Sequence, residues 1–244
     1  MGSAQRKLFG QGIPILAYHA VGAPPAGVKD PYLYVSEDEF NQQLTRLREA
    51  GFRSTLLGES LDQSQRIVIT FDDGYRNVFD HATDVLKQHG FHAIQFIISD
   101  LIGGRNEWMV GKGDVPEPLM DQHQIREWLA EGHQIGSHSA THAKLRRMQL
   151  AQAREEIMGS KKRLEDMFGI PINHFSYPFG EYNEAVRDLV VEAGYQMACT
   201  MKFGVNTTTT PRHELRRITP LSGPKLTAKI GHRARTWIKK RFVS

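Results

Sequence analysis

IVITFDD, at residues 67–73, is followed by Gly74 and Tyr75, and this stretch decides the fold. Its β-branched and aromatic residues form a continuous apolar run, which is typical of a strand buried on both faces in a parallel sheet. The two aspartates at its carboxyl end are costly to bury unless positive charge compensates them. Either aspartate alone could simply cap the next helix, but the pair, together with histidines later in the chain, favours a metal site.

Strand-like and helix-like segments alternate about seven times along the chain. Alternation of this kind implies a parallel sheet with right-handed crossovers, closed or nearly closed as a barrel. An open doubly wound sheet is the alternative, but it would need a glycine-rich phosphate loop after the first strand, and residues 19–22 do not supply one. Strands are predicted near 13–18, 52–57, 67–71, 91–98, 134–137, 174–177, 195–200 and 215–218, and helices begin near 36, 76, 121, 149 and 183.

The composition is that of an ordinary soluble globular protein. The 244 residues are 40% hydrophobic and 24% charged, which suits one α/β domain or at most two small ones. A single cysteine, Cys199, excludes an intrachain disulfide and an all-cysteine metal site. We find no apolar stretch long enough for a signal peptide or a membrane span. The chain as written is therefore expected in the cytoplasm or at a membrane surface, although a secreted protein without its leader would have the same sequence.

Basic charge is concentrated near the C-terminal end. Residues 225–244 carry seven Lys or Arg and no acidic residue, so the rest of the chain holds 24 basic and 27 acidic residues. This distribution argues against nucleic-acid binding by the whole protein. Apolar residues recur there at helical spacing, which predicts a helix that contacts an anionic membrane or one that docks on the barrel with a solvated basic face. We divide the chain into an N-terminal extension (1–12), a main domain (13–222) and a basic amphipathic helix (223–244).

His138 and His142 form an HxxxH pair within GSHSATH, residues 136–142. Two histidines four residues apart face the same way if the backbone turns helically between them. In a chain with eleven histidines the pair is weak by itself. It gains weight because it follows a predicted strand, as the aspartates do, and in a barrel both would open on the same rim. Zinc binds imidazole and carboxylate together, and a catalytic zinc site keeps one position for water.

Asp72 and Asp73 are expected to have different roles, because successive side chains of an extended backbone alternate in direction. One carboxylate would bind the metal and the other would act as a base. A metal lowers the pKa of its bound water, and a nearby carboxylate can take the remaining proton. The combination predicts attack of an activated water on an acyl carbon.

A third cluster, FSYPFGEYN at 175–183, ends another predicted strand. Tyr177, Pro178 and Phe179 would form a rigid turn with aromatic walls, and its backbone N–H groups could face a developing oxyanion. From these residues alone, an ordinary aromatic turn that packs the rim is the preferred interpretation. The long predicted loop 102–120 contains Trp108, which either contacts a ligand or plugs the barrel mouth.

Together these motifs resemble a known family. TFDDGY (70–75), HSATH (138–142) and SYPFGEYN (176–183) are similar, in order and spacing, to the first three motifs of the polysaccharide deacetylases of carbohydrate esterase family 4, which share the NodB-homology domain. The resemblance covers roughly residues 13–220. ILAYHAVG (15–22) and LRRITP (215–220) resemble the branch that acts on exopolysaccharides and polymers like poly-N-acetylglucosamine.

The resemblance implies a deformed (β/α)7–8 barrel of the NodB-homology type, in which 13–222 is the catalytic domain. It implies a divalent metal, usually Zn²⁺, with Co²⁺, Ni²⁺ or Fe²⁺ as other candidates, and release of acetate from an N-acetylated glycan. Asp72 would be the general base, and the backbone N–H of Phe179 would help hold the oxyanion. The metal ligands would be Asp73, His138 and His142. The substrate-contacting residues would be Tyr75, Trp108, Tyr177 and Pro178.

The chain departs from the family pattern in three places. Ser176 stands where many members have the arginine that orients the base, so Arg216 or Arg217 is the candidate replacement. The Asp-Trp pair of the fourth motif is not visible, and neither is the late Leu-x-x-His that supplies a general acid. His19, at the end of the first predicted strand, is the candidate acid, with a structural, hydrogen-bonded histidine as the alternative.

The expected function is therefore metal-dependent N-deacetylation of an envelope or exported glycan, which places the protein in the periplasm or outside the cell if a leader has been removed. Two alternatives use the same residues: a glycan-binding protein that has lost turnover, and a deacylase of a small non-sugar amide. The expected partner is the N-acetylated glycan, with peripheral membrane contact through 225–244 and no nucleic acid.

Overall fold

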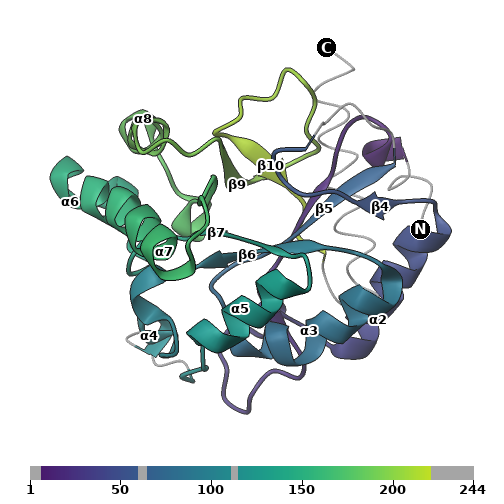
Figure 1. Cartoon of the computed structure of the whole chain (residues 1–244). Coiled ribbons are helices and arrows are strands. Elements are labelled where there is room, and N and C mark those ends of the chain that lie inside the picture. The colour runs from purple at the N-terminus through teal and green to yellow at the C-terminus, as the bar shows by residue number, and fades with distance from the viewer. Residues whose placement is uncertain (1–6, 60–64, 111–114, 221–244) are drawn as a thin grey trace.

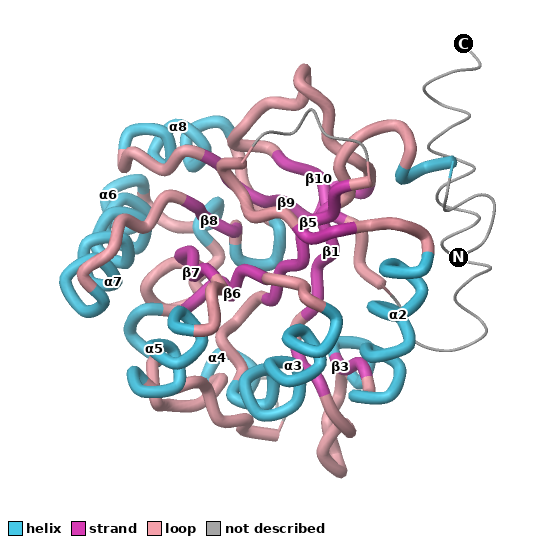
Figure 2. Tube along the Cα trace, turned by 45° about the vertical axis from the view of Figure 1, so that its right-hand side comes forward, coloured by secondary structure: helices cyan, strands magenta, loops and turns pink. Residues whose placement is uncertain are grey.

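The computed structural model describes residues 7–59, 65–110 and 115–220. Its core is a parallel sheet nearly closed into a barrel, with helices arranged around the outside (Figures 1 and 2). The predicted barrel is thereby confirmed, and the open doubly wound sheet is excluded.

The strands follow one another around the ring in nearly sequential order. Closure occurs next to Ile218, whose carbonyl accepts from Ala17 N–H at 3.0 Å and whose N–H donates to Ile15 O at 2.8 Å. Of the predicted strand 52–57 only β4 (Arg53–Ser54) forms, paired with the start of β5. The order is β1 (Ile15–Tyr18), β5 (Arg66–Phe71), β6 (Ala93–Ile97), β7 (Gln134–Ser137), β8 (His174–Ser176), β9 (Met197–Phe203) and β10 (Leu215–Arg217), with β2 (Ala20–Val21) and β3 (Tyr34–Val35) as a separate pair.

Helices cover the outer face of the ring, as Figure 2 shows. Their starts follow the capping residues of the sequence: Ser36 Oγ accepts from Glu39 N–H at 3.2 Å, and Asp121 and Gln124 form a reciprocal capping box. The α-helices are α2 (Glu37–Glu49), α3 (Arg76–His89), α4 (Glu107–Val110), α5 (Gln122–Ala130), α6 (Leu150–Arg154), α7 (Ser160–Phe168) and α8 (Glu184–Glu192). The short 3-10 helices are η1 (Pro31–Leu33), η2 (Ser99–Leu101), η3 (Leu145–Arg147) and η5 (Pro178–Gly180).

The single helix predicted for 149–168 is interrupted. A π-helical turn, η4 (Glu155–Gly159), joins α6 to α7, so the helix carries a wider turn in its middle. Periodicity could not indicate this turn, because Ala153 before it, Ile157 within it and Leu164 after it are all buried at spacings that an uninterrupted helix would also give.

Strand β5 separates an inner core from an outer core. Ile67, Ile69 and Phe71 belong to the outer cluster, which packs the sheet against the helices. Val68 belongs to the inner cluster on the barrel axis, and Thr70 continues this side by donating to Leu16 O at 2.7 Å. The alternation of a pleated strand therefore brings the next inward position, Asp72, to the carboxyl end of the barrel axis.

The predicted N-terminal extension, residues 1–12, is described from residue 7 onward. Leu8 and Phe9, in the predicted extension 1–12, are buried, and Phe9 packs edge-on against Phe52 with ring centroids 5.6 Å apart. Residues 7–12 are therefore packed with the main domain. The helix predicted for 223–244 lies outside the described residues, so its membrane contact remains a prediction. None of the helices in the described ranges combines the length and the apolar character that crossing a membrane requires.

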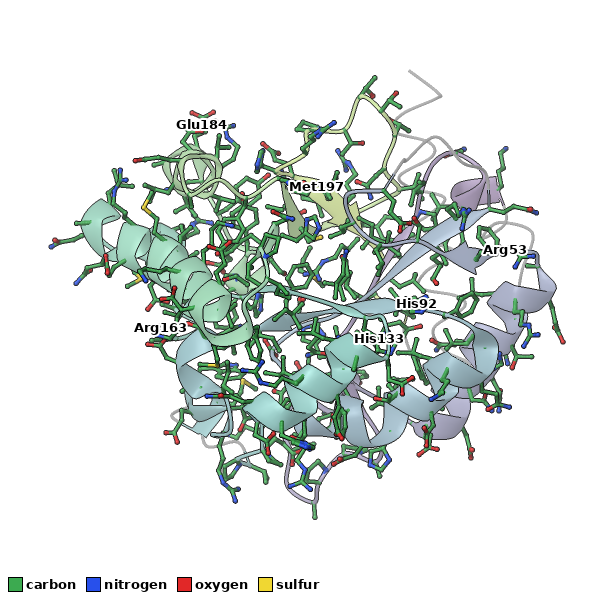
Figure 3. The ribbon with its side chains drawn as sticks, in the orientation of Figure 1. Arg53, His92, His133, Arg163, Glu184 and Met197 are labelled. Carbon is green, nitrogen blue, oxygen red and sulfur yellow. The ribbon has the colours of Figure 1, made fainter. Side chains whose placement is uncertain are left out.

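A buried histidine sits on the helix-facing side of the sheet. His133 and His92, labelled in Figure 3, have ring centroids 5.7 Å apart. The His133 ring stacks on Trp128 at 4.0 Å, and its Nδ1 accepts from Ala93 N–H at 3.3 Å. Burial first, and repulsion by His92 second, lower the pKa of His133 to about 4.

This histidine should make the protein less stable in mild acid. In the unfolded state the pKa of His133 is about 6.5. Between that pH and the folded pKa of about 4, the unfolded state binds a proton that the folded state does not bind, so stability falls as pH decreases. Between pH 7.5 and pH 5, the free energy of unfolding of wild type should fall by about 2 kcal/mol more than that of His133→Gln, which keeps an acceptor for Ala93. Urea unfolding at both pH values measures this, and equal falls would contradict it.

Candidate active site

Two neighbouring carboxylates reach the same place by different backbone conformations. Asp72 continues the inward alternation of β5, and its backbone N–H donates to Tyr18 O at 3.0 Å. Asp73 would point outward if the strand continued, but its φ is 73° and that of Gly74 is 75°. This left-handed turn brings the Asp73 side chain back toward the barrel axis. A non-glycine residue in this region is strained by about 1–2 kcal/mol, and aspartate is among the residues that tolerate it best.

The histidine pair converges through a tight loop and not through a helical turn. His138 follows β7 directly, and Ser139 and His142 both have positive φ, 66° and 63°. Ser139 Oγ accepts from His142 N–H at 3.1 Å, which closes the loop. The two imidazole centroids are 4.9 Å apart. The predicted convergence is therefore present, whereas the helical geometry expected for it is wrong.

Asp73, His138 and His142 form a three-ligand set. The Nε2 atoms of both histidines lie 3.2 Å from Asp73 Oδ1, and the three candidate ligand atoms lie within 4.8 Å of one another. All three residues are buried, and among the described residues Asp73 Oδ1 has no hydrogen-bond donor. His138 Nδ1 donates to Ser176 O at 2.7 Å, which leaves the lone pair of Nε2 directed at the same point.

Lone pairs that converge in a buried site repel one another unless a cation binds them. Two imidazole nitrogens and one carboxylate oxygen are a donor set that suits zinc and other first-row divalent metals. Three protein ligands also leave room for water or substrate, as catalytic zinc sites do. The residues present therefore fit a catalytic divalent metal.

Arg217 binds Asp72 with both ends of its guanidinium. Its Nη1 donates to Asp72 Oδ1 at 2.8 Å and its Nη2 to Oδ2 at 2.7 Å, in a fully buried pair. The remaining donors reach Thr200 O at 2.9 Å, Ser176 Oγ at 3.0 Å and Thr70 Oγ1 at 3.3 Å. Burial alone would raise the pKa of Asp72, but the charge of Arg217 holds that pKa below its ordinary value.

The arginine that orients Asp72 therefore comes from β10 and not from the motif at 176–183. Of the two candidates from the sequence, Arg217 takes this position. The Arg216 guanidinium instead donates to Phe203 O at 3.3 Å. Ser176, where many family members carry the arginine, is short enough to leave room for Arg217 and accepts from it.

A cavity of about 180 Å³ opens over these groups. Asp72, Asp73, His138 and His142 line its buried part. His19 is the other titratable group close to Asp72: its Nε2 lies 4.0 Å from Asp72 Oδ2, and its side chain is 18% exposed. The remaining lining residues are Asp30, Leu33, Trp108, Met109, Phe179, Gly180 and Met201.

Two aromatic residues predicted near the substrate line this cavity. The Trp108 ring packs at 4.5 Å from the His142 ring and the Phe179 ring at 4.4 Å from it, so both flank a predicted metal ligand. Phe179 has a φ of 61°, which turns the segment after β8 toward the cavity. Ligand contact by Trp108 and an oxyanion role for the Phe179 N–H remain predictions.

Three other residues predicted to contact the substrate are buried and lie outside the cavity lining, and their contact with substrate stays a prediction. Tyr75 is 2% exposed, and its hydroxyl accepts from Asn106 Nδ2 at 3.4 Å. Tyr177 is fully buried, donates to His213 O at 3.1 Å and stacks on Tyr182 at 4.7 Å. Pro178 is also buried. Tyr177 and Pro178 pack within the turn that carries Phe179, as the packing interpretation of the aromatic turn expects, whereas Tyr75 lies beside Trp108, with ring centroids 6.4 Å apart.

Sequence reasoning missed lining residues that carry no motif. Leu33 and Asp30 belong to the loop after β2, and Met201 lies in the carboxyl half of β9. The rule that barrel sites form from the carboxyl ends of strands and the loops after them would have indicated both regions, though not these particular residues.

Comparison with known proteins agrees with the fold and the site. The family model described as polysaccharide deacetylase matches residues 61–198, more than half of the chain. YxkH of Bacillus subtilis is 28% identical over 214 residues, which cover 84% of this chain and 70% of YxkH. The peptidoglycan-N-acetylglucosamine deacetylase PgdA of Listeria monocytogenes is 28% identical over 126 residues, 51% of this chain and 24% of PgdA.

A solved structure gives the same fold. IcaB from Ammonifex degensii superposes with a TM-score of 0.77 at 23% sequence identity, covering 92% of this chain and 97% of IcaB. The motifs, the barrel and the match to the family model lead to one conclusion: this chain belongs to the polysaccharide deacetylase family, with a barrel of the NodB-homology type.

Proposed function

We propose that this protein is a metal-dependent hydrolase that removes N-acetyl groups from an N-acetylated polysaccharide. The observation that carries the proposal is the convergence of Asp73, His138 and His142 within 4.8 Å beside the carboxylate of Asp72. Membership of the polysaccharide deacetylase family supports an acetylated sugar as substrate. The relative PgdA is named for N-acetylglucosamine in peptidoglycan, which favours an N-acetyl group over an O-acetyl group.

In the proposed mechanism the chain supplies the base, the acid and the orientation. When bound by Asp73, His138 and His142, a divalent ion would acidify a water molecule and polarise the acyl carbonyl. Asp72 accepts the proton of that water as the water oxygen attacks the acyl carbon. The pKa of Asp72 lies below its ordinary value because of Arg217, so the carboxylate is ionised and ready at neutral pH.

The second half of the reaction requires an acid. His19 lies 4.0 Å from Asp72 and faces the cavity, so it can donate a proton to the amine nitrogen as the carbon–nitrogen bond breaks. The products are acetate and a sugar with a free amine. The Phe179 backbone N–H would donate to the oxygen that becomes negative during the attack.

The test is acetate release by the purified protein from N-acetylglucosamine oligomers, O-acetylated sugars and small N-acetylated amides, with metal analysis of the same sample. Release from the oligomers that a chelator abolishes and zinc restores would support the proposal, and Co²⁺, Ni²⁺ and Fe²⁺ should be compared with zinc. Chelator-resistant release would refute the metal-dependent mechanism. Glycan binding without release would favour the non-catalytic alternative, and a preference for small amides would favour the deacylase.

Replacing His19 separates an acid from a structural histidine. His19→Gln should lower kcat about 100-fold or more, because protonation of the leaving amine loses its donor. The zinc content and KM should change little, because His19 is not among the three converging ligands. Steady-state acetate release and metal analysis measure this. His81→Gln, a partly exposed histidine paired with Glu37 at 3.1 Å, is the control. Wild-type turnover in His19→Gln would leave His19 with only a structural role.

A further inference from the structure

A buried glutamate outside the cavity holds the loop that carries both metal-binding histidines. Glu156 is 8% exposed. Its Oε2 accepts from the backbone N–H of Ala140 at 3.0 Å and of Thr141 at 2.9 Å. Its Oε1 accepts from the Thr141 hydroxyl at 2.6 Å. The carboxylate therefore binds the middle of the 138–142 loop through three hydrogen bonds without touching either imidazole ring.

The π-helical turn η4 carries this carboxylate to the loop. Helical π turns are rare, and they occur frequently at functional sites. The turn is fixed to the barrel at its far end, where Ser160 Oγ lies 2.7 Å from Ser137 Oγ, at the end of β7. Glu156 thus approaches the loop from an element anchored on the strand that delivers His138.

The opposite side of the loop is also held. Its carbonyls at Ser139 and Ala140 accept from the backbone N–H groups of Ser99 and Asp100, at 3.2 and 3.0 Å. Arg163 of α7, labelled in Figure 3, forms an ion pair with the Asp100 carboxylate. This ion pair connects η2 to α7, the helix that directly follows η4. The loop is therefore clamped between η2, which donates to its carbonyls, and Glu156, which accepts from its N–H groups.

This clamp has a consequence for the histidines, because the loop adopts a strained shape. Ser139 and His142 both have positive φ, a conformation that non-glycine residues rarely adopt without support. Without an acceptor at Glu156, the two adjacent N–H groups would lose their hydrogen bonds, and the loop would relax to bond them elsewhere. Relaxation at 140–141 would separate His138 from His142.

We propose that Glu156 is a positioning residue that presets His138 and His142 for metal binding. This inference rests on the proposed metal site and goes beyond it, because Glu156 contacts neither the cavity nor the three ligand side chains. Residues that orient metal ligands from outside the coordination sphere typically contribute 10- to 100-fold to metal affinity.

The experiment measures the zinc dissociation constant of the full chain by competition with a chromophoric chelator. Glu156→Ala should raise it about 10- to 100-fold, because all three hydrogen bonds are lost. Glu156→Gln should stay within about threefold of wild type, since its amide oxygen can accept both N–H groups and its amide nitrogen can donate to the Thr141 hydroxyl. Glu155→Ala, in the same π turn but exposed, is the matched control and should bind like wild type.

A second readout reports the ligand geometry directly. The visible absorption of bound Co²⁺ should change in Glu156→Ala and remain wild-type-like in Glu156→Gln, with circular dichroism confirming that each variant is folded. If Glu156→Ala does not fold, Glu156→Asp decides, because it keeps the charge but is one methylene shorter and cannot reach all three donors in the same geometry. A weaker zinc affinity and an altered Co²⁺ spectrum in that variant would support the proposal, and no change would overturn it.

The outcomes separate this inference from the proposed function. Unchanged zinc affinity in folded Glu156→Ala would overturn the positioning role and leave the metal site standing. An equal loss in Glu156→Gln and Glu156→Ala would also overturn it, since the glutamate would then act through its charge and not through the loop geometry. A wild-type protein that binds none of Zn²⁺, Co²⁺, Ni²⁺ and Fe²⁺ would refute the proposed function, and this inference would fail with it.

Discussion

Asp72→Asn is expected to lower kcat/KM for acetate release by about 100-fold or more, while the protein keeps its zinc. The amide has nearly the same shape as the carboxylate but cannot accept the proton of the attacking water. Zinc should remain, because the converging ligand set consists of Asp73, His138 and His142 and does not include Asp72. Steady-state acetate release and metal analysis of the same preparation test both halves of this expectation.

His138→Ala is the contrasting variant for this test. It removes one of the three ligands, so zinc and turnover should be lost together. Full activity in Asp72→Asn would show that Asp72 is not the base. Loss of zinc in Asp72→Asn would instead identify Asp72 as a ligand and would require a different division of roles between the two carboxylates.

The barrel could be predicted because each central strand carries its own signal. Strand β5 is a continuous apolar run, and the structure buries its two faces in different cores, with Val68 on the axis and Ile69 under the helices. Capping residues such as Ser36 and Asp121 also fixed two helix starts, because their side-chain bonds depend on residues only three positions away. Signals of this kind depend on residues that are close together in the chain, so they can be recognised in the sequence alone.

The residues of the candidate metal site could be predicted, but the backbone conformation that brings them together could not. Carboxylates and imidazoles that follow parallel strands meet at one rim of a barrel, so their positions indicated that one of the two aspartates would lie beside His138 and His142. The resemblance to the family, and not the position, assigned Asp73 to the metal. The positive φ values of Asp73, Ser139 and His142 depend on tertiary contacts such as the hydrogen bonds of Glu156 to residues 140 and 141. No local pattern indicates a left-handed aspartate or histidine.

The surroundings of the aromatic residues could not be predicted from the sequence. Tyr177 and Tyr75 stand beside motif residues, and proximity in sequence suggested that they contact substrate. Both side chains are buried outside the cavity lining. The Tyr75 hydroxyl accepts from Asn106, and the Tyr177 hydroxyl donates to the His213 carbonyl. An aromatic residue with a polar tip fits such a buried position as well as it fits a sugar, and only the packing distinguishes the two.

Arg217→Met is expected to destabilise the protein by about 3–5 kcal/mol at neutral pH, because it leaves the buried carboxylate of Asp72 without its charge partner. It should also reduce turnover strongly, since Asp72 loses the guanidinium that orients both of its oxygens at 2.8 and 2.7 Å. Arg217→Lys keeps the charge but not the bidentate geometry, so it should recover stability better than activity. Urea unfolding and acetate release of the two variants measure this separation.

The pH dependence of stability and a double variant show whether the Asp72–Arg217 ion pair itself causes the expected loss of stability. In wild type the pKa of Asp72 is lower in the folded state than in the unfolded state, despite burial. The ion pair therefore stabilises the protein fully at pH values above the unfolded pKa, and this contribution is lost as pH falls through the folded pKa. Arg217→Met removes the largest influence that lowers the pKa of Asp72, while the effect of burial remains, so that pKa should be higher than in wild type and the stability gap to wild type should narrow as pH decreases. Asp72→Asn combined with Arg217→Met should unfold less readily than Arg217→Met alone, because it removes the uncompensated charge. If the double variant were less stable by the sum of the two single effects, the pair would contribute no coupling, and Arg217 would have to act on stability through its bonds to Thr200 and Ser176 instead.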